Sequence, residues 1–259
     1  MRNETLDSIG VLQDELSSWF DYSPSTLRTD IRFLKDGCGV RLRMGRKTPF
    51  DDQHGIEVLD KMDLHQAVFT VGELAKEVTK YPPNLIRRSG LKVIRIVEGI
   101  KGDPVYSAPG WGGFYDSDTR TIYVIDICID DTFHHEFAHC LDNLEDARDS
   151  LTLWKKTFPK KDYVGDGFID ERSIPRKSGF VRPYGRVNPS EDRATVLEWL
   201  MTSDALISDR LKTDKILGHK VELMKNFLLE ISGGLMDKHF FEDFNEGKVN
   251  RGYWDKAPR

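Results

Sequence analysis

Three residues near the middle of the chain have types and spacing that suit metal chemistry. His135, Glu136 and His139 form the pattern HExxH within HHEFAHCLDNL, residues 134 to 144. Two histidines four positions apart lie one above the other on a helix face, so both imidazoles can reach one metal ion. Such sites hold zinc, which lowers the pKa of a bound water to about 7, and the intervening glutamate serves as general base. The pattern therefore predicts a catalytic Zn2+ ion and a hydrolytic reaction.

The neighbouring residues favour a helix that presents both histidines to a cleft. Asp130 or Asp131 can cap a helix that begins directly after them. His135 and His139 lie largely on a different face from the apolar residues, together with Asp142 one turn further on. The apolar residues recur at helical spacing and are expected to be buried: Phe133, Phe137, Cys140, Leu141 and Leu144.

A catalytic zinc ion usually takes three protein ligands and keeps one position for water, so a third ligand is required. Glu191 is the strongest candidate, because it lies in the first turn of a second predicted helix over residues 189 to 201. Asn188 or Ser190 can cap that helix, and Pro189 suits its first position. A rigid helix can present one carboxylate to the metal. The other candidate ligands are three glutamates elsewhere in the chain: Glu145, Glu171 and Glu198.

A longer stretch of the sequence resembles a known group of zinc peptidases. HEFAHCLD is followed by Tyr184, seven positions before a Glu-Asp-x-Ala helix that starts with Glu191. Upstream, YPPNLIRRSGLKVIRI and GWGGFYDSDTRTIYVID extend the likeness, which covers roughly residues 70 to 202. This segment is similar to the catalytic domain of anthrax toxin lethal factor and to the related secreted Pro-Pro endopeptidases. Thr195 departs from that family, which often has a second glutamate there, so the resemblance leaves the substrate open.

The resemblance implies a role for each matched residue. His135, His139 and Glu191 would bind the zinc ion. Glu136 would be the general base, and Tyr184 would help to stabilise the transition state. The resemblance also implies export and a role as a secreted toxin or effector protease.

The chemistry of these residue types leads to the same reaction. Glu136 would take a proton from the attacking water and return it to the leaving amine, while the Tyr184 hydroxyl stabilises the developing oxyanion. We therefore expect a zinc-dependent endopeptidase that acts on a protein or peptide substrate. The alternative is a zinc-binding protein without turnover that acts by binding a protein partner. Glu136 argues against it, because a purely structural zinc site has no need of a base.

Composition narrows the class of protein. With 259 residues, 39% of them hydrophobic, the chain can bury a full core. A net charge of -5 gives no basic surface for nucleic acid, so we expect no nucleic-acid partner. Three cysteines, Cys38, Cys128 and Cys140, are too few for a disulfide framework. No apolar run is long enough for a membrane span or a signal-peptide core. We expect a cytoplasmic protein, or one exported without a recognisable signal peptide.

Hydrophobic periodicity predicts the remaining elements. Helices are expected near residues 4 to 20, 71 to 80 and 214 to 233, and strands near residues 38 to 44, 92 to 97 and 121 to 125. The glycines before the last strand allow a hairpin turn or a close backbone approach. We expect the strand over residues 121 to 125 at the sheet edge, where an extended substrate can pair with it. Trp111, Phe114 and Tyr115 are candidate walls of the substrate pockets.

These elements predict an α+β fold, a zincin-like metallopeptidase with a small mixed sheet, an HExxH active-site helix and a mostly helical C-terminal part. The predicted domains are an N-terminal region of unknown role over residues 1 to 65, which can pack on the rest, and a metallopeptidase domain over residues 66 to 259.

Overall fold

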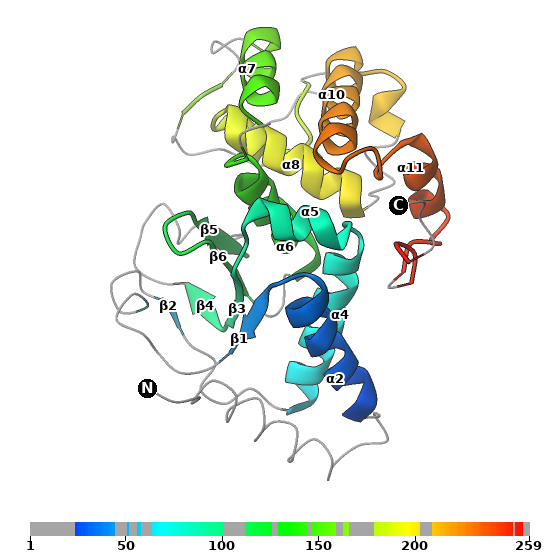
Figure 1. Ribbon diagram of the computed structural model, residues 1–259. Helices are drawn as coiled ribbons and strands as arrows, with labels where there is room; N and C mark the ends of the chain where they lie inside the picture. Colours follow the sequence, from blue (N-terminus) through cyan, green and yellow to red (C-terminus); the bar gives the residue numbers. More distant parts are fainter. Residues whose placement is uncertain are drawn as a thin grey trace.

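A computed structural model shows how the predicted elements assemble (Figure 1). It describes residues 24–44, 51, 56–57, 64–100, 112–125, 129–144, 147–158, 163–165, 179–202, 209–250 and 252–255. The helix predicted near residues 4 to 20 lies outside these ranges, as do Trp111, Cys128, Glu145 and Glu171.

A mixed sheet of four strands forms one side of the molecule. Its order is β1-β3-β6-β5, and β1, β3 and β6 run parallel while β5 is antiparallel to β6. The bounds are β1 Arg41–Arg43, β3 Val93–Val97, β5 Gly113–Asp116 and β6 Thr121–Ile125. A second sheet pairs β2 Ile56–Glu57 with β4 Gly99–Ile100. The strands predicted near residues 38 to 44, 92 to 97 and 121 to 125 are therefore confirmed.

The predicted position of the strand over residues 121 to 125 is wrong. That strand, β6, lies between β3 and β5, and both neighbours are hydrogen-bonded to it. Its sequence, TIYVI, has no alternation of polar and apolar residues, which is typical of a strand buried on both faces. β5 instead ends the sheet within the described residues. The glycine-rich segment leads into the hairpin of β5 and β6, whose turn over residues 117 to 120 includes Arg120 at φ 55°.

Helices pack on one face of the sheet and continue beyond it (Figure 1). Their bounds, including a short π-helical turn (η1) and a 3-10 turn (η3), are α2 Pro24–Arg32, η1 Phe33–Gly37, α4 Leu64–Thr79, α5 Pro83–Ser89, α6 Ile129–Leu141, α7 Ala147–Thr157, η3 Pro183–Arg186, α8 Pro189–Thr202, α10 Lys215–Ile231 and α11 Lys238–Asn245. The Asp214 side chain caps α10 by accepting a hydrogen bond from the backbone N–H of Leu217 at 3.1 Å, as expected from the sequence.

The main hydrophobic core lies between the sheet and α6, and it extends to α8 and α10. Ile122 and Val124 of β6 face Phe133 and Phe137 of α6 across this core, and all four side chains are fully buried. On β5, Tyr115 packs on the main core, whereas Phe114 belongs to a smaller cluster with Tyr123. Neighbouring residues of a strand point to opposite faces, so Phe114 does not face α6 and only Tyr115 remains as a described candidate wall.

The architecture confirms the predicted α+β class, with a small mixed sheet, an HExxH helix and a mostly helical part after residue 188. β1 belongs to residues 1 to 65, yet it pairs with β3 of the main sheet. That region therefore contributes a strand to the main sheet, and the division into two domains stays a prediction.

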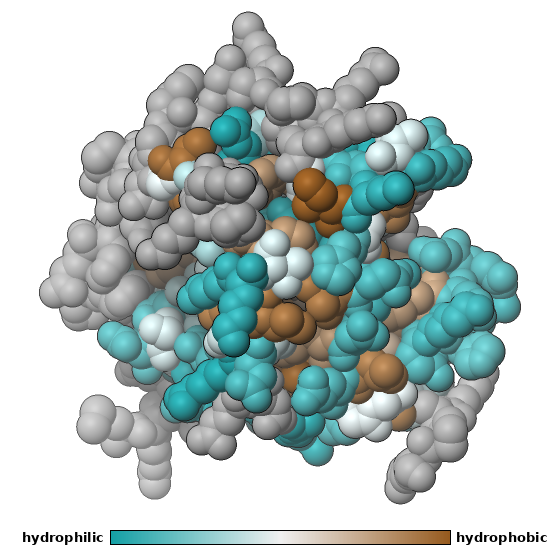
Figure 2. Space-filling model, turned by 90° about the horizontal axis from the view of Figure 1, so that it is seen from above, coloured by the Kyte–Doolittle hydropathy of each residue, from teal (hydrophilic) through white to brown (hydrophobic). Residues whose placement is uncertain are grey.

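Two further features concern the length of the described helices and the hydrophobic residues on their surface. None of them combines the length and apolar character needed to cross a bilayer. Figure 2 views the molecule from above, the end that carries α7 and α10, and hydrophobic residues show there among hydrophilic ones. Leu153 of α7 and Ile216 of α10 are each about half exposed.

Candidate metal site

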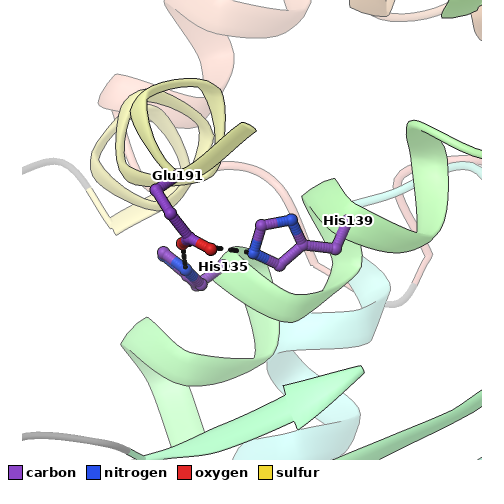
Figure 3. Close-up of side chains that lie close together, drawn as sticks. All are labelled: His135, His139 and Glu191. Atoms are coloured by element: carbon purple, nitrogen blue, oxygen red, sulfur yellow. Dashed lines mark hydrogen bonds and ion pairs between the residues drawn. The ribbon is translucent and has the colours of Figure 1, made fainter. Parts of the chain in front are cut away.

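The three predicted metal ligands lie together between α6 and α8. The Nε2 atom of His135 is 2.9 Å from Oε2 of Glu191, and the Nε2 atom of His139 is 3.4 Å from the same oxygen. One ligand atom from each residue lies within 4.8 Å of the others. Figure 3 shows the Glu191 carboxylate pointing from α8 into the space between the two imidazoles of α6. The structure thus brings together on two helices the residues that the spacing predicted.

The start of α6 differs from the prediction. The helix begins at Ile129, so Asp130 and Asp131 lie inside its first turn rather than before it. Carboxylates are favoured there, because the free N–H groups make that end of a helix electropositive. The two aspartates therefore do indicate the start of the helix, but they lie in its first turn rather than at its cap. Four-residue spacing then places the rings of His135 and His139 with their centroids 5.1 Å apart.

Asn188 fixes the first turn of α8. Its side-chain oxygen accepts hydrogen bonds from the backbone N–H groups of Ser190 at 2.8 Å and Glu191 at 3.0 Å. Because Pro189 has no N–H, these two bonds satisfy the first two N–H groups that α8 itself offers. Of the two caps expected from the sequence, Asn188 therefore makes the capping bonds, and they hold the backbone from which Glu191 reaches the histidines.

Glu198 supports a histidine from behind. Its Oε2 atom lies 3.0 Å from Nδ1 of His135, on the side of the ring away from Glu191, and Arg182 forms an ion pair with the same oxygen. A carboxylate at Nδ1 holds the proton there and leaves Nε2 free to bind a metal. The sequence allowed Glu198 as an alternative third ligand. In the structure its carboxylate instead lies at hydrogen-bond distance from His135, which is itself a candidate ligand.

Ser190 and Asp142 support the other histidine. Nδ1 of His139 lies 3.2 Å from the hydroxyl of Ser190, which donates in turn to Asp142 at 3.1 Å. The guanidinium of Arg193 lies 3.1 Å from Asp142. Both imidazoles therefore direct Nε2 toward Glu191 and bind a supporting group through Nδ1. Sequence reasoning considered Ser190 only as a helix cap and gave no signal for Arg193 or Arg182.

Charges around the site shift the pKa values of its members in different directions. Burial lowers the pKa of His135, but hydrogen bonds to Glu191 and Glu198 outweigh it and raise that pKa to about 10. Burial alone would raise the pKa of Glu191, yet its hydrogen bonds to the two histidines hold that pKa well below the usual range. Burial raises the pKa of Glu136, although His135 and His139 oppose this shift.

Tyr184 faces the site from the 3-10 turn before α8. The centroid of its ring is 5.7 Å from that of His135, and its hydroxyl hydrogen-bonds Glu191. Burial raises the pKa of Tyr184, and the charges of Glu191 and Glu136 raise it further. The hydroxyl therefore keeps its proton at neutral pH and can act as a hydrogen-bond donor.

A buried network outside the site anchors α6 from behind. His134, the histidine directly before the motif, lies 2.8 Å from the hydroxyl of Tyr81 and 2.6 Å from the carboxylate of Glu77. Glu77 also forms an ion pair with Lys80, whose ammonium donates to the backbone carbonyl of Met201 at the end of α8. His134 therefore ties α6 to α4 and contributes no ligand to the candidate metal site.

Two imidazole nitrogens and one carboxylate oxygen are a donor set of catalytic zinc sites, and the hydrogen bonds at both Nδ1 atoms fit such a site. His135, His139 and Glu191 therefore form a candidate site for a zinc ion. Glu136, which lies between the two histidines in sequence, is buried beside them.

Comparisons with known proteins give a limited likeness. No protein-family model matches the sequence, and no curated protein sequence matches it. The fold is similar to the crystal structure of a candidate zinc-binding metallo-peptidase from Bacteroides caccae, with a TM-score of 0.49 and 17% identity over 88% of this chain and 95% of that chain. A likeness this low assigns no activity to this chain, and membership of the lethal factor family stays a prediction.

Proposed function

We propose that this protein is a zinc-dependent endopeptidase that hydrolyses peptide bonds in a protein or peptide substrate. The convergence of His135, His139 and Glu191 carries this proposal, because their ligand atoms lie within 4.8 Å of one another while Glu136 is buried beside them. A zinc ion held there would act as a Lewis acid and would lower the pKa of a bound water to about 7.

Glu136 would act as the general base and then as the general acid. Its carboxylate would accept a proton from the water that attacks the scissile carbonyl carbon, and it would deliver that proton to the amine as the C–N bond breaks. Burial raises the pKa of Glu136, which moves this pKa toward neutral pH. A carboxyl group with such a pKa can accept a proton in one step and release it in the next.

Tyr184 would stabilise the negative charge that develops on the carbonyl oxygen. Its hydroxyl stays protonated because burial and neighbouring carboxylates raise its pKa. A preorganised hydroxyl donor contributes more to the transition state than to the ground state, because the oxygen gains charge during the reaction.

An extended substrate would pair with β5 rather than with β6. β5 ends the sheet within the described residues, next to α6, and a strand at a sheet edge can hydrogen-bond an extended peptide. A Cβ atom at Gly113 would clash with the Tyr123 carbonyl oxygen of β6 and come within 2.7 Å of the Thr132 side chain on α6, so glycine permits the close approach of β5 to both elements. Tyr115 of the same strand packs on the core beside α6 and is a candidate wall of the substrate cleft.

The test is a digest of a peptide library read by mass spectrometry, with and without a zinc chelator. Cleavage that the chelator abolishes and added zinc restores would support the proposal. Zinc binding without any cleavage would favour the alternative function, a zinc-binding protein that acts by contact with a partner. Cleavage that survives complete removal of zinc would contradict both.

A further inference from the structure

The two residues that follow Glu191 are buried charges, and each has an oppositely charged partner: Lys220 for Asp192 and Asp142 for Arg193. Asp192 and Arg193 are fully buried in the first turns of α8. The Asp192 carboxylate accepts hydrogen bonds from the indole N–H of Trp154 in α7 at 3.0 Å and from the Tyr163 hydroxyl at 2.8 Å. The Nζ atom of Lys220 in α10 lies 2.7 Å from the same oxygen. Asp192 is thus the meeting point of α7, α8 and α10.

Lys220 lies in an aromatic environment. It is 1% exposed, and its ammonium lies 3.9 Å from the centroid of Phe180 and 4.7 Å from that of Phe158. A buried charge of this kind is costly unless an opposite charge and hydrogen bonds compensate it. The Asp192 carboxylate supplies this opposite charge. The ion pair therefore holds α10 at one defined position on α8.

The pair acts on the turn that carries Glu191. Consecutive residues of a helix point about 100° apart, because a turn takes about 3.6 residues. Glu191 therefore points to α6 while Asp192 points to α7 and α10, and Figure 1 shows α8 between these elements. Holding Asp192 on one side limits how far the turn can rotate, and so it limits where the Glu191 carboxylate can lie.

We propose that Lys220 is a positioning residue for the zinc site: its ion pair with Asp192 sets the direction of Glu191. This inference rests on the proposed zinc site. Lys220 touches no proposed ligand, and its effect passes through Asp192 and the backbone of one helical turn.

A purely structural ion pair would stabilise the fold without affecting the metal, and the chain offers a matched control for that case. Arg95 of β3 forms an ion pair with Asp51 at 2.7 Å, and both side chains are as buried as those of Lys220 and Asp192. Arg95 lies beside the Tyr123 ring, which belongs to the smaller hydrophobic cluster rather than to the core around α6. Breaking this pair removes one buried ion pair far from α8.

The experiment measures the zinc dissociation constant of the full chain by competition with a chromophoric chelator, together with the visible spectrum of the Co2+-loaded protein, which reports coordination geometry. Lys220→Met should weaken zinc binding about tenfold, as the loss of groups that orient ligands commonly does, and should change the Co2+ spectrum. Arg95→Met should lose a similar amount of thermal stability while its zinc dissociation constant stays within about twofold of wild type. Wild-type zinc affinity and an unchanged Co2+ spectrum in Lys220→Met would overturn the inference.

Two further measurements keep the outcome decisive. If Lys220→Met does not fold, Tyr163→Phe removes a milder contact to Asp192 and should weaken zinc binding in the same direction by a smaller factor. Wild-type affinity in that variant would then contradict the inference. If the wild-type chain itself binds no zinc, the proposed function fails. If the wild type and Lys220→Met bind zinc with the same dissociation constant, only the positioning role of Lys220 fails.

Discussion

Glu136 occupies a buried position at which two influences on its pKa oppose each other. Burial raises that pKa, and the neighbouring histidines lower it while Glu191 and Glu198 raise it again. The side chain is not among the three groups that converge as ligands. Its chemistry can therefore be removed without removing a ligand, which separates metal binding from catalysis.

Glu136→Gln should lose most turnover and keep its zinc. The amide has nearly the same shape but cannot accept the proton of the attacking water, so kcat should fall about 10²-fold to 10⁴-fold. The check is peptide cleavage together with zinc content. Glu222→Gln in α10, which removes an exposed carboxylate, is the control and should behave as wild type. Unchanged cleavage by Glu136→Gln would remove Glu136 from the mechanism.

Tyr184→Phe should have an intermediate effect. The loss of one donor to the oxyanion should lower kcat about 10²-fold, while Glu136 still transfers the proton. The variant should still hold about one zinc ion per chain, because His135, His139 and Glu191 all remain. A variant with wild-type kcat would show that Tyr184 has a structural role only.

At the scale of elements, α6 and α8 build the site from two sides. α6 contributes both histidines and α8 contributes Glu191, and α8 also contributes Glu198 and Ser190, which hold the outer nitrogens of the two rings. These supporting contacts depend on how the two helices cross. The sequence could predict the spacing within each helix but not the distances between them.

Glu198→Gln tests the support that α8 gives to α6. Replacing the carboxylate at Nδ1 of His135 with an amide makes that imidazole a weaker ligand, so the zinc dissociation constant should rise about tenfold. Competition with a chromophoric chelator measures it. Glu230→Gln, at the end of α10, is the control and should leave the affinity unchanged. If Glu198→Gln retained wild-type affinity, the contact with His135 would contribute nothing to the metal site.

The same contrast explains which elements the sequence could predict. The HExxH helix, the Asn188 cap and the Asp214 cap follow from local spacing and short-range hydrogen bonds, and the structure has all three. The lack of alternation in TIYVI indicates a strand buried on both faces, but which strands lie beside β6 depends on its long-range pairing with β3 and its pairing with β5. The ion pairs of Arg182 and Lys220 likewise join residues that meet only after folding.

At the scale of the whole molecule, protons and zinc would compete for one site. Interactions with Glu191 and Glu198 raise the pKa of His135 to about 10, and the same histidine contacts hold the pKa of Glu191 low. Without metal, the raised pKa of His135 contributes stability that is fully present below about pH 6.5, its ordinary pKa, and is lost as pH rises through about 10. Glu191 has the opposite sign, and its contribution is lost as pH falls below its ordinary pKa.

Zinc should therefore stabilise the fold more strongly as pH rises. A metal ligand must be a neutral imidazole, so binding displaces the His135 proton, and each displaced proton weakens apparent affinity about tenfold per unit fall in pH. The increase in Tm on adding zinc to chelator-treated protein should be larger at about pH 8 than at about pH 6. Differential scanning fluorimetry at a fixed zinc concentration measures it. An equal increase at both pH values would show that no proton is displaced.

The most direct measurement of the central claim is a zinc titration of activity. Chelator-treated protein is given a peptide that the wild type cleaves, and the initial rate is followed as zinc is added. For wild type, the rate should rise from near zero and level off at about one zinc ion per chain, as expected for one catalytic site. Glu191→Ala should stay near zero over the same range, because the third ligand is gone. Full cleavage before any zinc is added, or a wild-type titration curve from Glu191→Ala, would contradict a catalytic zinc held by His135, His139 and Glu191.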